Sequence, residues 1–158
     1  MKNKINDINE DLDEDLDEDF DEILNEVIFS EYIKLANEMR TMSCVKERIW
    51  KKLGQFSEDN TIGTHNELIN DIRMEFEVIN SIIRGRKCEL KRLWSRKAEL
   101  DQDYKLTNRK KNRKEIEKEI EIILEKIHEI KELNAIDFND ISNMQFQYNN
   151  WKNFNPKE

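Results

Sequence analysis

Residues 64–104 decide the fold of this chain, and they read THNELINDIRMEFEVINSIIRGRKCELKRLWSRKAELDQDY. Apolar side chains return here every three or four positions, which places them on one face of an α-helix. The stripe keeps one heptad register with Arg86 and Lys97 as its polar interruptions, and it consists of Leu68 or Ile69, Ile72, Phe76, Ile79, Ile83, Leu90, Leu93, Leu100 and Tyr104. We therefore expect a helix of about forty residues over 65–104, roughly 60 Å long.

The start of this helix is indicated by the run Thr64-His65-Asn66-Glu67. The run has the pattern of a capping box, in which the Thr64 hydroxyl and the Glu67 carboxylate satisfy two unpaired backbone amides of the first turn. The polar residues 55–63 before it form a connection long enough to reverse the chain direction.

Two more stripes flank the central one. The first is expected to begin with Ser30 as the N-cap and to end at Gly54, and it contains Tyr32, Leu35, Met39, Met42, Ile49 and Leu53, with Val45 standing in beside Lys46. The third, over 113–133, contains Ile116, Ile120, Ile123, Ile127, Ile130 and Leu133. It is two residues out of phase with the central stripe, so the chain must bend, turn or stutter across 105–112. A short aromatic helix is expected over 138–153.

Composition supports an all-α, elongated fold. Charged residues make up 39% of the chain, hydrophobic residues 37%, and there are only three Gly and one Pro. So little apolar material cannot build a thick core, and the stripes must pack as an antiparallel hairpin or coiled coil, or against a partner. We expect the packing or partner interface to consist of Leu35, Met39, Met42, Ile49, Leu53, Ile72, Phe76, Ile79, Ile83, Leu90, Leu93, Leu100, Ile116, Ile120, Ile123 and Ile127.

Charge is distributed in blocks. Residues 1–22 hold eleven acidic groups and two Lys, and we expect them to be a disordered acidic tail before a helical domain over 23–158. Their acidic spacing approaches that of a calcium loop, but Leu16 stands where such a loop needs Gly, so a solvated tail is the better interpretation. Residues 84–114 hold thirteen basic and four acidic groups. This basic block could bind polyanions such as RNA, although a solvated helix face is the simpler interpretation and the sequence pI near 5.0 argues against a dedicated nucleic-acid binder.

The sequence offers no catalytic constellation, and we expect no enzyme, no cofactor and no metal. His65 and His128 are far apart, and neither lies in a zinc-binding pattern. Cys44 and Cys88 are interpreted as separate free thiols, with a disulfide between helices possible only in an oxidising compartment. We also expect no membrane-spanning segment and no N-terminal targeting sequence, because apolar runs are short and the first residues are acidic.

One run of the first stripe is distinctive, Met39-Arg40-Thr41 with Arg48-Ile49 downstream. Together with several other runs, it resembles the coiled-coil domain-containing protein 58 family of small eukaryotic helical proteins. The resemblance spans roughly residues 30–156 at low identity, and its other elements are Tyr32-Ile33-Lys34-Leu35, Leu53, the stretch 68–83, Glu132-Leu133-Asn134 and the closing Phe154-Asn155-Pro156.

The resemblance implies a non-catalytic protein of the mitochondrial intermembrane space that supports or regulates protein import. The family's cysteine pair aligns here with His65 and with Ile82 or Ile83, so the oxidative import route of the family is not implied for this chain. The residues alone leave two alternatives open. These are a coiled-coil scaffold or tether subunit of another complex, and polyanion or RNA binding through the basic block. If the resemblance does not hold, we expect a cytoplasmic location.

Overall fold

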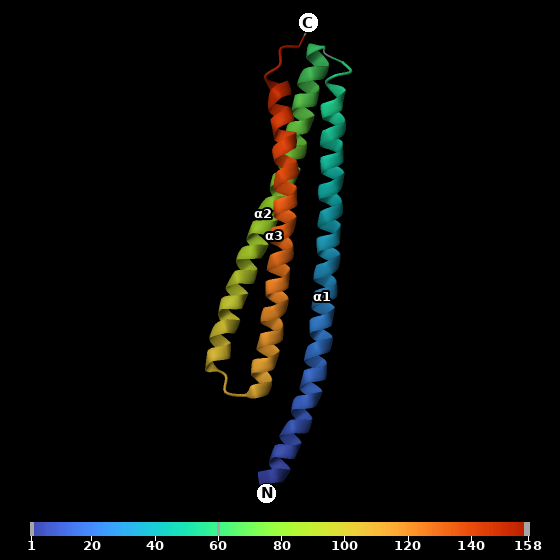
Figure 1. Ribbon diagram of the computed structural model, residues 1–158. Helices are drawn as coiled ribbons and strands as arrows, with labels where there is room; N and C mark the ends of the chain where they lie inside the picture. Colours follow the sequence, from blue (N-terminus) through green and yellow to red (C-terminus); the bar gives the residue numbers. More distant parts are fainter. Residues whose placement is uncertain (1, 60, 157–158) are drawn as a thin grey trace.

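The computed structural model consists of three long helices, α1 (Lys2–Gln55), α2 (Ile62–Leu106) and α3 (Lys110–Lys152) (Figure 1). It describes the backbone of residues 2–59 and 61–156, and the side chains of 20–30, 33–59 and 61–156. No strand occurs within these residues. The prediction of an all-α chain with long packed helices is confirmed.

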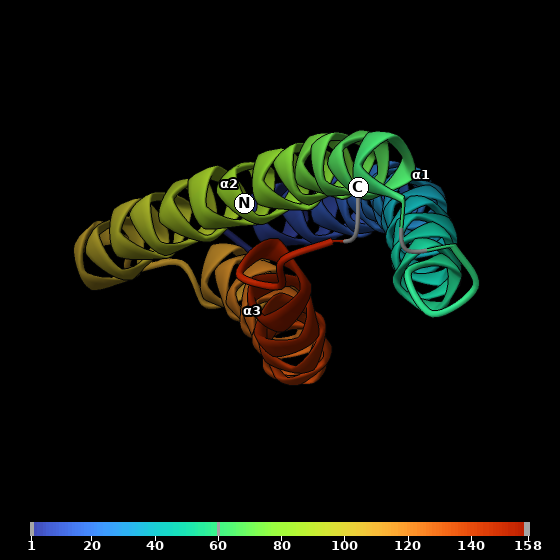
Figure 2. The ribbon, with the colours of Figure 1, turned by 90° about the horizontal axis from the view of Figure 1, so that it is seen from above.

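The helices alternate in direction along one elongated bundle. Residues 56–61 join α1 to α2 at one end, and residues 107–109 join α2 to α3 at the other (Figure 1). The C-terminus lies beside the first connection, whereas α1 extends at its N-terminal end beyond the second connection (Figure 1). Figure 2, a view from above, shows α2 crossing over the space between α1 and α3. Accordingly, α2 makes most of the contacts with both neighbours, and α1 meets α3 less extensively.

The reversal predicted over 55–63 is confirmed, and the break expected across 105–112, for which the sequence leaves a bend, a turn or a stutter open, is a turn. Two predicted boundaries are wrong. We expected α1 to start at Ser30, yet the helix continues through this residue without a break. We also expected a short separate helix over 138–153 after an end at Leu133, whereas these residues are the last turns of α3. Asn-rich sequence weakens a helix only slightly, and no Gly or Pro occurs between Lys110 and Pro156.

The predicted capping box is also wrong. The N-cap of α2 is Thr61, whose side chain makes no cap hydrogen bond. Asp59 organises this connection instead, because its carboxylate accepts hydrogen bonds from the Thr61 backbone N–H at 3.0 Å and from the Thr64 hydroxyl at 3.0 Å. The backbone hydrogen bond is the main reason why the pKa of Asp59 is lowered. Thr64 therefore lies inside α2, and its hydroxyl helps to hold the loop before the helix through Asp59.

The acidic segment 1–22 lies largely outside the residues whose side chains are described. The backbone of residues 2–22 belongs to α1. The prediction that this segment is disordered and solvated stays a prediction, as does our argument against a calcium loop within it. The helical domain predicted over 23–158 includes most of α1 and all of α2 and α3.

Apolar side chains form two clusters at different heights of the bundle. The first joins all three helices at the end where α1 meets α2, and its buried members are Met42, Val45, Ile49, Leu53, Phe56, Leu68, Ile72, Phe76, Ile79, Met144 and Tyr148. Aromatic contacts join its members from the first half of the chain to the C-terminal part of α3. Phe56 stacks on Trp151 with ring centroids 5.0 Å apart, and Phe76 meets Tyr148 edge-on with centroids 5.4 Å apart. The C-terminal aromatic residues thus complete the core beneath α1.

The second cluster belongs to the α2–α3 hairpin alone. Its buried members are Leu93, Leu100, Ile123, Ile127 and Ile130, with Leu90, Ile116 and Ile120 packed against them. At the turn, Arg113 donates a hydrogen bond to the Thr107 carbonyl at 2.7 Å and lies over the Tyr104 ring at 5.1 Å. These contacts close the hairpin at the end opposite the first cluster.

The predicted interface residues lie in or beside these clusters, with one exception. Most are buried, and Leu35, Ile83, Leu90, Ile116 and Ile120 are half-buried. Met39 is 44% exposed and does not belong to the packed face, so only its assignment to a partner interface stays a prediction. The physical reason is the helical rotation of α1, because Met42 and Val45 face the core while Met39 lies toward the outer side.

Burial predicts how strongly truncation will destabilise the bundle. Ile72 is fully buried in the first cluster, so Ile72→Ala should lower the free energy of unfolding by about 2–5 kcal/mol in urea titrations. Met74→Ala is the matched control on the same helix, since Met74 is 57% exposed. Its effect should stay within about 0.5 kcal/mol. Equal losses from the two variants would contradict the assignment of the core.

Candidate functional site

A buried arginine joins the three helices between the two apolar clusters. Arg86 of α2 has a side chain that is 2% exposed. Its Nε donates to Glu38 Oε1 of α1 at 2.5 Å, and its Nη1 donates to Asp137 Oδ2 of α3 at 2.5 Å. The same Nη1 also donates to Asn134 Oδ1 at 3.2 Å. One guanidinium therefore fixes the relative heights of α1, α2 and α3.

Lys46 of α1 adds a second cation to this layer. Its ammonium group donates hydrogen bonds to Asp137 and, at 2.7 Å, to Asp140. Burial acts to lower the pKa of Lys46, but the hydrogen bonds to the two aspartates outweigh it and raise the pKa above its ordinary value. Lys46 is consequently charged at neutral pH. We call Glu38, Lys46, Arg86, Asn134, Asp137 and Asp140 the charged layer.

Burial of the charged layer is costly in free energy, and this cost makes the layer selective for one alignment of the three helices. Removing ions from water carries a penalty that only close pairing repays, and a misaligned helix would leave the charges unpaired. A buried polar group of this kind specifies register in helical assemblies. The layer thus determines which residues of the three helices face each other.

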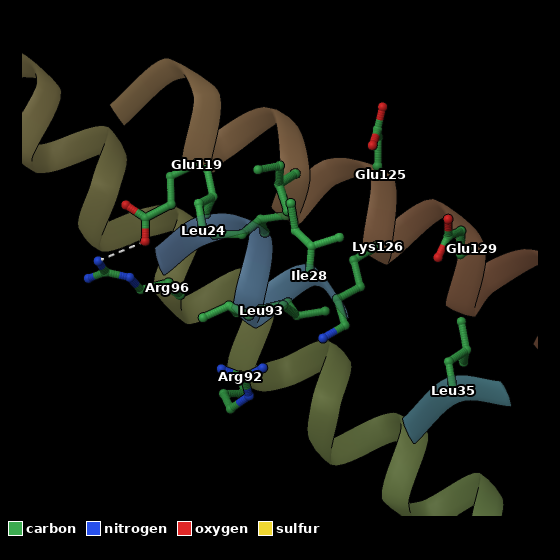
Figure 3. Close-up of a pocket in the computed structure, with 13 residues that line it drawn as sticks. Leu24, Ile28, Leu35, Arg92, Leu93, Arg96, Glu119, Glu125, Lys126 and Glu129 are labelled. Carbon is green, nitrogen blue, oxygen red and sulfur yellow. Dashed lines mark hydrogen bonds and ion pairs between the residues drawn. The ribbon is translucent and has the colours of Figure 1, made fainter. Parts of the chain in front are cut away.

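An apolar groove lies beside this layer, between the N-terminal half of α1 and the α2–α3 hairpin. It has a volume of about 280 Å³ and is lined by Leu24, Val27, Ile28, Leu35, Arg92, Leu93, Arg96, Glu119, Ile122, Ile123, Glu125, Lys126 and Glu129. Figure 3 shows Leu24 and Ile28 of α1 pointing toward the hairpin, with Arg96 of α2 paired to Glu119 of α3 at 3.2 Å. The groove has an apolar floor and charged edges.

A smaller pocket of about 160 Å³ continues from the groove toward Arg86. Leu35 and Lys126 line both cavities, and the other residues around the pocket are Lys34, Glu38, Gly85, Arg86, Glu89 and Ile130. Arg86 Nη2 is buried and has no hydrogen-bond partner among the residues that the structure describes. Unpaired buried donors are rare and costly in proteins. This atom is the one exceptional polar group beside the two cavities.

Glu89 is held in its ionised form at the edge of the pocket. Arg92 donates two hydrogen bonds to it, at 3.0 and 2.6 Å, and Lys126 Nζ lies 3.4 Å from its Oε1. The hydrogen bonds from Arg92 lower the pKa of Glu89 to about 2, against an opposing effect of burial. The carboxylate therefore stays charged over the physiological pH range.

A third feature is the outer face of α1, which carries exposed apolar side chains. Phe29 is 66% exposed, Ile33 45% and Trp50 39%, and Ala36 is exposed on the same face. Positions 29, 33, 36, 40, 43, 47 and 50 alternate steps of four and three, which is the spacing of a coiled-coil seam, with Arg40, Ser43 and Glu47 as its polar positions. The described helices α2 and α3 do not cover this face.

Of the two histidines and two cysteines, one histidine is buried in the core and the other three side chains are exposed. His65, which we placed in a helix cap, is instead buried against Phe56 at 5.2 Å and near Phe154 at 6.3 Å. His128 is exposed and pairs with Glu132 at 3.0 Å. Cys44 and Cys88 are exposed free thiols. Among the described residues, no three potential metal ligands gather in one place.

The basic block is partly neutralised within the bundle. Arg92 pairs with Glu89, Arg96 with Glu99 and Glu119, and Lys97 with Asp101. Arg86, counted in the same block, is buried in the charged layer. These pairs leave less positive charge for an external phosphate than the sequence suggests.

The residues that resemble the coiled-coil domain-containing protein 58 family do not converge on one site. Thr41 donates to the Asn37 carbonyl of its own helix at 3.0 Å. Arg48 forms two hydrogen bonds of 3.0 Å with Glu75, and Ile49 is buried in the first cluster. The remaining two, Met39 and Arg40, are exposed. The run therefore serves packing between α1 and α2 as well as the surface.

Sequence reasoning missed most of the charged layer. It marked Arg86 as an interruption of the apolar stripe and noted Lys46 beside Val45, but it named none of the acidic partners. Asp137 and Asp140 were not found because their segment was expected to form a separate short helix. A useful signal was present, since two cations interrupt apolar stripes on different helices and each requires a buried acid.

Comparisons with known proteins identify no relative of this chain. No family model, no curated protein and no solved structure matches the chain. Among the described residues, no helix contains a run apolar enough and long enough to span a bilayer.

The lowered pKa of Glu89 makes part of the stability depend on pH. A lowered pKa means that the folded state favours the charged form, so the stabilisation is complete above the ordinary value of 4.5 and disappears as pH falls toward about 2. The stability difference between wild type and Glu89→Gln, measured by urea unfolding, should therefore narrow through this window. Glu121→Gln controls for loss of a surface carboxylate. A difference independent of pH would contradict the assignment.

Coupling within the charged layer can be tested with a double-mutant cycle. Asp137→Leu should destabilise the protein by about 3–5 kcal/mol, because it leaves Arg86 and Lys46 with one acidic partner each. Adding Arg86→Met should recover a large part of this loss, since the unpaired cation is removed as well. Additive losses in chemical denaturation would show that the two side chains do not act as a pair.

Proposed function

We propose that this protein is a non-catalytic helical factor that binds another protein through the outer face of α1. The observation that carries the proposal is the exposed heptad seam with Phe29, Ile33, Ala36 and Trp50. Exposure of apolar side chains at this spacing to water is unfavourable. Their burial against the apolar face of an amphipathic partner helix is favourable. The seam requires no movement of the core, because the opposite face of α1 holds the three-helix cluster.

The architecture is suited to this role. The charged layer and the first apolar cluster anchor α1 from Glu38 to Leu53. The seam runs from this anchored stretch, which carries Trp50, into the N-terminal half of α1, which carries Phe29 and Ile33.

The family resemblance supplies the cellular setting that we propose. Members of the coiled-coil domain-containing protein 58 family suggest a factor of the mitochondrial intermembrane space that supports or regulates protein import. His65, which aligns with one of the family's cysteines, packs between aromatic rings, so this position serves the core. The proposed import factor accordingly does not depend on a disulfide at that position.

A scaffold or tether subunit of another complex is the alternative. It would use the same seam, and only its location and partner would differ. Polyanion binding through residues 84–114 has less support, since several of these cations pair with acidic side chains within the bundle.

The seam is tested by a double substitution. Phe29→Asp with Ile33→Asp should abolish co-purification of the partner with the tagged full-length chain, while urea unfolding stays within about 1 kcal/mol of wild type because both side chains are exposed. Phe146→Asp is the matched control, since Phe146 is 68% exposed on α3. Equal recovery of the partner with wild type, the double variant and Phe146→Asp would rule out the seam as the binding surface.

Location separates import from the scaffold alternative. A tagged copy should resist protease in intact mitochondria and become digestible when the outer membrane is ruptured. Fractionation of the chain with the cytosol would exclude the import role and leave the scaffold role.

A further inference from the structure

The outer seam of α1 is a bounded stretch of the helix. One further step of four from Trp50 reaches Gly54, near the end of α1. In the other direction the next heptad positions are Glu26 and Glu22, so the apolar part of the seam begins at Phe29. All seam positions from 29 to 54 are exposed, and in Figure 1 both α2 and α3 lie on one side of α1. The seam is roughly 39 Å long at 1.5 Å per residue.

The spacing of the seam is the same when it is read from either end. Steps of four and three alternate along it, and the first and the last step are both four. Two copies of α1 that pack antiparallel about a two-fold axis between positions 40 and 43 therefore match along the whole seam. In this arrangement 29 faces 54, 33 faces 50, 36 faces 47 and 40 faces 43. A two-fold interface requires a surface that is complementary to itself in this way.

The side chains that face each other in this arrangement also match in size. In three of the four pairs a large residue faces a small one, and these pairs are Phe29 with Gly54, Arg40 with Ser43, and Glu47 with Ala36. The fourth pair is Ile33 with Trp50, which brings two apolar side chains together.

The space beside Gly54 is open to a large side chain. Apart from its two chain neighbours and the backbone of its own helix, no atom of the described residues lies within 4 Å of the place that a Cβ of Gly54 would take. Phe29, which is 66% exposed, can therefore pack there when it comes from a second copy.

The charges of the seam favour the antiparallel direction. Arg40 and Glu47 are exposed, and neither forms an ion pair with another residue that the structure describes. In the antiparallel arrangement Arg40 faces Ser43 of the second copy, and Glu47 of that copy follows about 6 Å further along the axis, within reach of a long side chain. The two-fold axis makes this contact twice. Parallel packing in register would instead place Arg40 on Arg40 and Glu47 on Glu47, which is unfavourable.

The ends of the seam specify one register. A shift by one heptad in one direction places Trp50 against Glu26. A shift in the other direction places Phe29 opposite residue 61, beyond the end of α1 at Gln55. Both shifts leave an apolar side chain without an apolar or open position to face.

We propose that the outer seam of α1 binds the α1 seam of a second copy of this chain, antiparallel, with the two-fold axis between residues 40 and 43. This inference rests on the proposed function, because it names the partner of the same seam. The dimer buries Phe29, Ile33 and Trp50 of each copy. The two α2–α3 hairpins lie outward on opposite sides of the α1 pair.

Sedimentation equilibrium with the full-length protein tests the dimer and its charges. Wild type should form a dimer in the micromolar range. Arg40→Glu and Glu47→Arg should each raise the dimer dissociation constant at least about tenfold, because each change turns two attractive contacts into repulsive ones. The double variant Arg40→Glu Glu47→Arg should recover most of the affinity. Lys91→Glu, an equal charge change at an exposed position of α2, should have no effect.

A wild-type chain that is monomeric throughout the micromolar range overturns the inference. A double variant that dimerises no better than the weaker single variant overturns the pairing of Arg40 with Glu47 of the second copy.

Cysteine cross-linking tests the direction of the two helices. Cys44→Ser and Cys88→Ser first remove the exposed native thiols. A mixture of the Ala36→Cys and Glu47→Cys proteins should then form a mixed disulfide dimer on oxidation, because positions 36 and 47 face each other. Ala36→Cys alone should not cross-link, since its two copies lie roughly 16 Å apart along the axis, too far for a disulfide. Efficient cross-linking of Ala36→Cys with itself overturns the antiparallel arrangement.

Failure of this inference can be distinguished from failure of the proposed function. If wild type is monomeric, but a different protein co-purifies with it and is lost from the Phe29→Asp Ile33→Asp variant, the second copy is not the partner and the proposed function stands. A dimer that persists in that variant uses another surface, which also overturns the inference.

Discussion

The hydrogen-bonded ion pairs of Arg86 with Glu38 and Asp137 are the constraint on which the rest of the structure depends. They are made by one side chain of α2 with one acid from each neighbouring helix. Apolar stripes of similar spacing can slide past each other by a heptad at small cost, because isoleucine and leucine are interchangeable in such a seam. A buried guanidinium cannot slide in this way, since any shift separates it from its acids. Both apolar clusters and the groove are therefore positioned by this one layer.

The sequence was sufficient for the helical class, the first chain reversal and most of the packed positions. Heptad spacing reports which side chains share a face, whereas the phase shift between the stripes marks a break across 105–112 without distinguishing the turn at 107–109 from a bend or a stutter. Boundaries were less predictable. Ser30 is a good N-cap residue, but a serine can also lie inside a long helix when the turns on both sides of it are helical. The Asn-rich C-terminal segment was read as a separate element, although packing of Met144 and Tyr148 against α1 and α2 keeps it helical.

The candidate site was mostly beyond sequence reasoning for a related reason. Periodicity identifies the apolar face of each helix but does not say which polar side chains on three helices meet at one height. Glu38, Asp137 and Asp140 look like ordinary surface acids when each helix is considered alone. They meet Lys46 and Arg86 only because the three helices pack with these residues at the same level along the bundle axis. The groove has the same origin, because its walls come from three segments that are far apart in the chain.

The composition of the first apolar cluster has a consequence for synthesis of the chain on the ribosome. Its α1 members, such as Val45 and Ile49, pack against a cluster that includes Met144 and Tyr148 near the other end of the sequence. The α1–α2 part of this cluster can form once α2 has been translated, whereas the part that contains Met144 and Tyr148 waits for nearly the last turn of α3. During this interval α1 and α2 expose the apolar side chains that α3 covers later, together with the outer seam of α1. This partly formed core is the surface that a chaperone or an early-binding partner would meet.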